Sequence, residues 1–241
     1  SVVRSRRFAL LAVTHSHHAW TRFAESNPKH AAIAHRVVEL GTGAPLQGAS
    51  PTPQDPPALL MLGRITVGED YKGHREILGA WPAVLEAVPD AQLWIAGDGD
   101  LRPELQRLVL MNHLQSSVRL FGLVTESEKE SLLSRCRAFA LPSRGEGFGI
   151  VYLEAMRMGR PCLVSTLDAG SEVVADAGLA VDPSDTDELA KAMCRLLQPG
   201  EEWQGWSRAA TRRYKTRFTE IHFRDRLRRL LEETMIQIDD A

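Results

Sequence analysis

Cysteine is scarce in this sequence, with three residues among 241. Cys136, Cys162 and Cys194 lie far apart within apolar stretches and lack the close spacing of metal ligands. We therefore expect buried free thiols and a reducing compartment, the cytoplasm. Long apolar runs are lacking too: none approaches the roughly 20 residues that span a bilayer, and no signal-peptide pattern opens the chain. Peripheral association with a membrane surface stays open.

An excess of charge of either sign is also lacking. The formal net charge is −2, which gives no electrostatic reason to expect nucleic acid as a partner. Hydrophobic residues make up 44% of the chain and charged residues 25%, the usual mix of a soluble globular protein. This composition excludes a disordered chain and predicts a packed core.

The first 50 residues lack the material for an independent domain. Two short apolar runs, Phe8–Val13 and Val37–Leu40, flank a polar stretch with helical character, Ala19–Ala34. Two strands and one helix bury too little surface to be stable alone. Clustered prolines between residues 51 and 57 hold the chain extended, which predicts an interdomain linker. Position 1 is Ser rather than Met, so a fragment and a processed product both stay open.

After this linker, short apolar runs alternate with segments of helical spacing. The predicted strands are Leu59–Gly63, Gln92–Ala96, Val118–Phe121, Ala138–Leu141, Cys162–Ser165 and Leu179–Val181. The predicted helices are His74–Val88, Leu101–Leu114, Glu126–Cys136 with Thr125 as N-cap, Ile150–Met158, a helix capped by Ser184 that runs to Leu197, Trp203–Tyr214 and Thr219–Ile236. This alternation predicts an α/β fold, a doubly wound, Rossmann-like parallel sheet over residues 51–200, with helices added over 201–241.

The strongest candidate site is the loop Pro142–Gly149, which connects a predicted strand to a predicted helix. Three glycines within five residues let a ligand approach the backbone, and the following helix directs its N–H groups at the same space. This combination suits an anion such as a diphosphate. A tight turn whose glycines serve geometry alone is the alternative interpretation. The loop matches neither a dinucleotide fingerprint nor a P-loop.

Charged side chains near this loop form a second set of candidates. Glu146 lies in the loop and Glu154 in the helix, about 12 Å apart if both were helical, which is too far for a glycosidase pair. Such a pair suits an elongated ligand with hydroxyls at each end. Arg64 and Lys72 follow the first strand and could neutralise a diphosphate. For Glu154 a solvated helix position is the alternative, and for each cation ordinary surface charge.

Two further motifs have simpler explanations. Asp98-Gly99-Asp100 imitates a metal motif but opens a helix, so we expect N-capping by one of the two aspartates. The run His15-Ser16-His17-His18 lacks helical spacing and a nearby carboxylate, so we expect surface histidines and no metal site.

Several motifs in a fixed order resemble the nucleotide-binding domain of the family 4 glycosyltransferases, retaining enzymes of the GT-B architecture. They are Gly63-Arg64, Tyr71-Lys72-Gly73, Ile95-Ala96-Gly97-Asp98-Gly99, Arg119-Leu120-Phe121-Gly122, Pro142-Ser143-Arg144-Gly145-Glu146-Gly147-Phe148-Gly149 and Leu153-Glu154-Ala155-Met156. The hallmark of that family is two glutamates separated by seven residues, which Glu146 and Glu154 match. The resemblance covers roughly residues 58–235.

The resemblance implies transfer of a sugar from a nucleotide-diphosphate donor to an acceptor. Glu154 would bind the ribose hydroxyls and Glu146 would contact the donor sugar, while Arg64 and Lys72 would hold the diphosphate. The backbone of the glycine-rich loop would approach the sugar and phosphates, and a second loop would frame the base. The residues concerned are Gly147, Phe148, Gly149 and Ile150 in the first loop, and Gly122 and Leu123 in the second. The resemblance implies no cofactor and no metal ion, because the cations take the place of a metal.

The implied partners are the nucleotide-sugar donor, an unknown acceptor and an N-terminal acceptor-binding domain. Residues 1–50 would be a remnant of that domain, and the helices of 201–241 would pack back toward it. The apolar face of the final helix should therefore be partly uncovered in this chain. One departure from the family pattern lies in Asp168-Ala169-Gly170-Ser171-Glu172, where many members carry a double glycine before a proline-glutamate pair; this leaves Glu172 without an assigned role.

Two other functions stay open on the sequence. Without an acceptor domain, the chain could be a non-catalytic nucleotide-sugar-binding module. A nicotinamide-dependent oxidoreductase would need a glycine fingerprint after its first strand, and Leu59–Gly63 is not followed by one.

Overall fold

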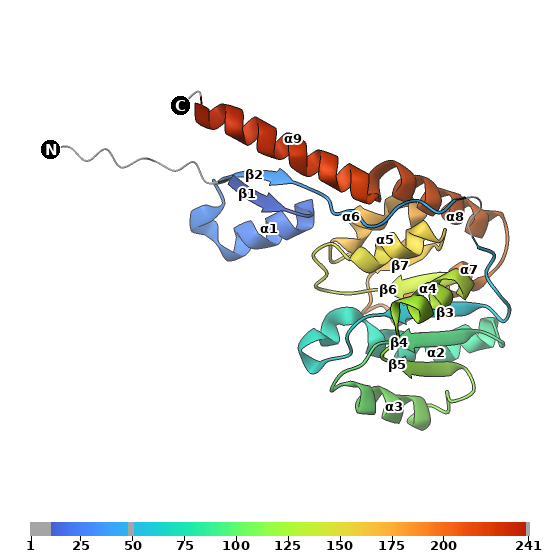
Figure 1. Ribbon diagram of the computed structural model, residues 1–241. Coiled ribbons are helices and arrows are strands. Elements are labelled where there is room, and N and C mark those ends of the chain that lie inside the picture. Colours follow the sequence, from blue (N-terminus) through green and yellow to red (C-terminus); the bar gives the residue numbers. More distant parts are fainter. Residues whose placement is uncertain (1–10, 48–50, 240–241) are drawn as a thin grey trace.

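A six-stranded parallel sheet forms the main body of the computed structural model, which describes residues 11–47 and 51–239 (Figure 1). The strands are β3 (Ala58–Leu62), β4 (Gln92–Ala96), β5 (Val118–Gly122), β6 (Ala138–Leu141), β7 (Cys162–Ser165) and β8 (Gly178–Val181). Their order in the sheet is β5-β4-β3-β6-β7-β8. The chain therefore runs outward from the centre twice, and its direction changes between β3 and β6. The predicted doubly wound fold is confirmed.

Helices cover both faces of this sheet. One face carries α2 (His74–Ala87), α3 (Arg102–Met111) and α7 (Thr186–Leu197), and the other carries α4 (Glu126–Arg135), α5 (Ile150–Arg157), the short α6 (Gly170–Val174) and α8 (Glu201–Arg213). Alternate side chains of β3 enter the two cores: Leu59 and Met61 pack on the first face, Leu60 and Leu62 on the second. Burial on both faces explains why the central strands β3, β4, β6 and β7 are nearly continuous apolar runs in the sequence.

Two helix starts test the predicted N-caps. Thr125 accepts a hydrogen bond from the backbone of Glu128, whose carboxylate accepts one from Thr125 in return, so the predicted cap is confirmed as a capping box. The prediction that Ser184 caps α7 is wrong. Its hydroxyl donates to Asp182 at 2.6 Å, and the carboxylate of Asp185 caps the helix by accepting from the Glu188 amide at 2.9 Å.

The predicted capping of α3 by Asp98 or Asp100 is also wrong. Within the described part of the chain, no side chain caps this helix, which begins after Leu101. Asp98 instead accepts from the neighbouring Gly99 amide, and Asp100 accepts from the Val67 amide at 2.8 Å. Asp100 thus connects the loop after β4 to the loop after β3.

The first unit of the chain is a two-stranded parallel sheet with one crossover helix. Its elements are β1 (Leu11–Thr14), α1 (His17–Ser26), a 3-10 turn (Pro28–His30) and β2 (Ala34–Val37). The beginning of the predicted strand Phe8–Val13 lies outside the described residues. The helix predicted over Ala19–Ala34 ends much earlier, because Pro28 has no N–H to continue it.

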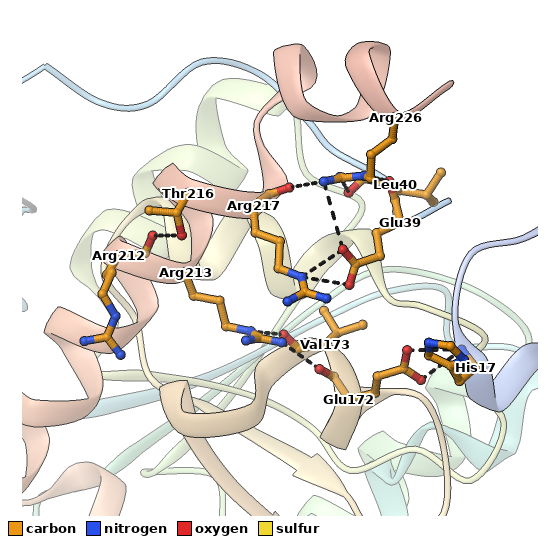
Figure 2. Close-up of polar contacts among 10 residues, drawn as sticks. All are labelled: His17, Glu39, Leu40, Glu172, Val173, Arg212, Arg213, Thr216, Arg217 and Arg226. Carbon is orange, nitrogen blue, oxygen red and sulfur yellow. Dashed lines mark hydrogen bonds and ion pairs between the residues drawn. The ribbon is translucent and has the colours of Figure 1, made fainter. Parts of the chain in front are cut away.

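The second strand of this unit lies three residues before the predicted one, Val37–Leu40. Leu40 and Glu39 leave the strand because their carbonyl oxygens accept hydrogen bonds from Arg226 (Figure 2). The carboxylate of Glu39 meanwhile accepts two bonds from Arg217 at 2.8 and 2.9 Å. The chain is therefore held at this point by C-terminal arginines rather than by a neighbouring strand.

The C-terminal elements are α8, a π-helical turn (Tyr214–Phe218) and α9 (Glu220–Asp239). Helix α9 runs from the sheet domain back past the first unit (Figure 1). Several of its apolar side chains are exposed: Ile221, Leu227, Leu231 and Met235. The expectation of a partly uncovered apolar face is thus confirmed. Within the described ranges, no helix is long and apolar enough to cross a membrane.

Candidate functional site

The loops after β3 and β6 meet at the centre of the sheet. Their strands are paired, with Leu60 opposite Phe139, so both loops leave the same edge side by side. The Arg144 amide donates to the Tyr71 carbonyl at 2.9 Å and joins the two loops. Gly73 has φ +83°, and a Cβ there would lie 2.7 Å from the Pro142 carbonyl oxygen. The place where strand order reverses is where open parallel sheets bind ligands.

Two adjoining cavities open at this edge. The first, of about 450 Å³, is lined by Lys72 and by the loop from Glu146 to Val151; the first unit contributes His15 and Ala19, and the segment after it contributes Leu40. The second, of about 320 Å³, is lined by residues that include Arg64, Asp98, Leu123, Lys129 and Glu154. Both cavities include Leu62, Gly63, Ile150 and Val151, so they form one elongated site.

The structure brings together nearly all of the predicted site residues. Lys72, Glu146, Gly147, Phe148, Gly149 and Ile150 line the first cavity; Arg64, Leu123, Glu154 and again Ile150 line the second. Gly122 lies outside the lining of both within the described chain, and a Cβ there would lie 3.4 Å from the Arg102 guanidinium. An elongated ligand could thus contact Glu146 and Glu154 at the same time.

The two predicted cations share one carboxylate. The side chain of Lys72 is only 11% exposed, and its Nζ lies 2.6 Å from a carboxylate oxygen of Glu69. Arg64 forms an ion pair with the same carboxylate, but its side chain is 76% exposed. Lys72 is therefore a buried cation at the end of β3, whereas Arg64 lies at the rim. Sequence reasoning missed Glu69, because an acidic residue in a polar loop carries no distinguishing pattern.

Glu154 is also part of an ion-pair network. Its side chain is 22% exposed, so it is not the solvated helix residue of the alternative interpretation. Lys129 Nζ lies 2.7 Å from Glu154 and 2.8 Å from Glu126. Burial lowers the pKa of Lys129, but its hydrogen bonds to Glu126 and Glu154 outweigh burial and raise that pKa. A charged Lys129 fixes the carboxylate of Glu154 at the edge of the second cavity.

The carboxylate of Asp168 holds the glycine-rich loop in place by accepting hydrogen bonds from backbone amides. One carboxylate oxygen of Asp168 accepts from the Glu146 amide at 3.1 Å, and the other accepts from the Gly170 amide at 2.8 Å. The Ala169 amide donates in turn to the Glu146 carbonyl at 3.1 Å. The backbone of Glu146 is thus fixed on both sides, which leaves its side chain to line the cavity. Asp168 was not among the predicted site residues.

The N-terminus of α5 lies at the same cavity. Gly149 precedes it with φ +83°, and a Cβ there would lie 2.3 Å from the Tyr152 ring, so this position requires glycine. Among the described residues no side chain caps α5, and its first residue, Ile150, lines both cavities. Uncapped N–H groups and the positive end of the helix dipole favour an anion there.

The raised pKa of the buried Asp168 carboxyl leads us to expect a specific dependence of folding stability on pH. Burial raises the pKa of its carboxyl to about 6, from an ordinary value of 3.8. The folded protein therefore binds this proton more tightly than the unfolded chain. The stability that Asp168 contributes is fully present below pH 4 and is lost as pH rises through 6, by about 3 kcal/mol at most. We expect Asp168→Asn to abolish this loss when urea unfolding is measured between pH 4 and 7.

The comparison with Asp168→Asn is needed because His74 acts in the same range with the opposite sign. Burial lowers the pKa of His74 to about 4 from 6.5, so its contribution is lost as pH falls through that window. His74 is unchanged in the variant, and the difference between the two proteins therefore isolates Asp168. Equal slopes of stability against pH in both proteins would contradict the prediction.

The chain resembles known proteins in sequence over its sheet domain. Residues 56–199 match the family of glycosyl transferases group 1. An α-D-kanosaminyltransferase of Streptomyces kanamyceticus is 34% identical over 149 residues, which cover 61% of this chain and 38% of that protein. A phosphatidyl-myo-inositol mannosyltransferase of Mycobacterium leprae is 34% identical over 195 residues, 76% of this chain and 51% of that protein. The chain thus spans about half or less of these relatives.

Solved structures show the same fold. Sucrose-phosphate synthase from Thermosynechococcus elongatus superposes with a TM-score of 0.77 at 22% identity, over 94% of this chain and 59% of that one. A TarM mutant from S. aureus, in complex with fondaparinux, α-GlcNAc-glycerol and UDP, gives 0.75 at 13% identity, over 91% of this chain and 43% of that one. At these identities the likeness concerns the fold.

Proposed function

Because this chain belongs to the group 1 glycosyltransferases and has the fold of their GT-B members, we propose that it binds the nucleotide-sugar donor of a retaining sugar transfer. The observation that carries the proposal is the elongated site itself. A buried cation, Lys72, and the carboxylate of Glu146 line its first cavity, and a second carboxylate, Glu154, lines the adjoining one.

In this proposal each part of the donor has its own contacts. The ribose hydroxyls donate to Glu154, and the diphosphate lies against Lys72, Arg64 and the first N–H groups of α5. The sugar occupies the first cavity beside Glu146. Stabilisation of the departing diphosphate is then the main catalytic contribution, and these positive groups supply it without a metal ion.

The half-buried and buried thiols of the chain agree with a cytoplasmic protein.

Calorimetric titration of the chain with UDP, GDP, ADP and NAD tests the donor site. One relative is named as GDP-mannose-dependent, and one solved neighbour contains UDP, so these two nucleotides come first. We expect one nucleoside diphosphate to bind, and Glu154→Ala to weaken it about 10- to 100-fold, because a charged hydrogen bond is worth roughly 1.5–3 kcal/mol. The matched control is Glu86→Ala, an exposed glutamate of α2. Binding of NAD alone would favour an oxidoreductase.

Turnover forms the second part of the proposal. Since the matched region spans about half or less of the relatives, we propose that an acceptor-binding domain completes the active enzyme. Adding such a domain in trans, or extending the chain, should produce sugar transfer where the chain alone shows donor binding only. Transfer by the chain alone at the same rate would contradict this part and leave the donor site intact.

A further inference from the structure

The first turn of α1 is attached to the glycine-rich loop. Ser16, the N-cap of α1, is completely buried, and its hydroxyl donates to the Gly147 carbonyl at 2.7 Å. The same oxygen accepts from the Ala19 amide at 3.0 Å, which is the ordinary capping bond. A single hydroxyl therefore caps the helix of the first unit and binds the residue that follows Glu146.

A carboxylate from the sheet domain completes this attachment. Glu172 of α6 accepts from the His17 amide at 3.0 and 3.1 Å (Figure 2). It also accepts from the His18 amide at 3.2 Å. The first turn of α1 has no acidic residue of its own, so Glu172 supplies the negative charge that a helix N-terminus favours. Its backbone carbonyl accepts from Arg213 at 2.8 Å, which ties α6 to α8.

These contacts determine which residues of the first unit line the first cavity. His15 and Ala19 lie on either side of Ser16 in the chain, and both line this cavity together with the loop that carries Glu146. His15 Nδ1 lies 3.2 Å from the Val38 carbonyl oxygen, which can only accept, so Nδ1 carries the proton. This hydrogen bond holds the imidazole of His15 at the cavity that it lines.

We infer that Ser16 and Glu172 are positioning residues of the donor site: they fasten α1 to the glycine-rich loop and thereby set His15 and Ala19 against the sugar of a bound nucleotide sugar. This inference rests on the proposed function and gives Glu172 a role. In the proposed function the nucleoside contacts Glu154 and the diphosphate contacts Lys72, Arg64 and the start of α5, which leaves His15 and Ala19 as contacts of the sugar.

Two measurements on the 241-residue chain test this inference. In the first, hydrogen exchange should be at least about 10-fold faster for the α1 amides in Glu172→Ala than in the unmodified protein, with the sheet strands unchanged. In the second, calorimetry compares UDP with UDP-glucose and GDP with GDP-mannose. Glu172→Ala should reduce the preference for the nucleotide sugar over its diphosphate at least 5-fold. Ser16→Ala should act in the same direction, and both variants should bind the diphosphate unchanged.

The matched control is Asp176→Asn, which removes a negative charge four positions further along the chain. Asp176 pairs with Arg212 at the surface, where both side chains are more than half exposed. If the α1 amides of Glu172→Ala exchange hydrogen at the same rate as those of the unmodified protein, Glu172 does not fasten α1 to the glycine-rich loop. Faster exchange with an unchanged preference for the nucleotide sugar would show a merely structural contact and overturn the positioning role. If the unmodified chain binds none of the four probes, the proposed function fails with it, while the exchange data still decide the fastening.

Discussion

Replacing Lys72 with Met should weaken binding of the preferred nucleoside diphosphate about 100-fold, and should lower sugar transfer by the intact enzyme by a factor of about 100 to 1,000. Met keeps most of the volume of the side chain but removes the ammonium that would bind the phosphates. The loss is large because the Lys72 side chain is only 11% exposed, so water cannot take the place of its ammonium. Glu69, 2.6 Å from the ammonium, would then repel the diphosphate.

Lys191→Met provides the control for this experiment, because Lys191 is an exposed lysine of α7 on the sheet domain. The Lys191→Met variant should bind the nucleoside diphosphate with the same constant as the unmodified chain. Arg64→Met should have a smaller effect than Lys72→Met, since the Arg64 side chain is 76% exposed and its charge is screened. If Lys72→Met binds the diphosphate as tightly as the unmodified chain, Lys72 does not contribute to diphosphate binding. Full transfer activity of an enzyme carrying both Glu146→Ala and Lys72→Ala would overturn the proposed function.

The sequence predicts the sheet domain well because the central strands of the sheet are buried on both faces. The strands Gln92–Ala96, Ala138–Leu141 and Cys162–Ser165 have the predicted bounds without change. Each is a short apolar run that ends beside glycine, proline or a polar residue, so the pattern contains the whole signal. The strands of the first unit are partly exposed, and β2 lies three residues from its predicted place. There the contacts of Glu39 with distant arginines decide where the strand ends.

The residues of the candidate site also fall into those that the sequence predicts and those that it misses. Lys72 and Glu146 follow predicted strands, so the topology alone places them at one edge of the sheet. Lys129 and Glu172 act through partners 25 and 155 positions away in the chain, and a local pattern contains no trace of such contacts. Sequence reasoning therefore finds residues that line the cavities, and misses the residues that hold them in place.

Gly97→Ala should be the most damaging small substitution in the sheet domain. Gly97 directly follows β4 with φ +145°, and a Cβ there would lie 1.8 Å from the Gly63 carbonyl oxygen and 2.9 Å from the Gly63 carbonyl carbon. Backbone atoms cannot yield as a flexible side chain does, so the ends of β3 and β4 must separate. Strain and overpacking of this kind cost about 3 kcal/mol or more, which lowers the melting temperature by roughly 6–12 °C in a protein of this size.

The same substitution should also impair the site, because Gly63 lines both cavities and precedes Arg64. We therefore expect Gly97→Ala to lose donor binding under conditions in which it is still folded, as measured by calorimetry and by urea unfolding on one preparation. Gly79→Ala is the matched control: a Cβ on this exposed position of α2 would meet no described atom within 4 Å. It should stabilise the protein by about 0.5–1 kcal/mol, since Ala has the higher helix propensity. If Gly97→Ala unfolds at the urea concentration of the unmodified chain, the two strand ends are not in the close contact on which the shape of the site depends.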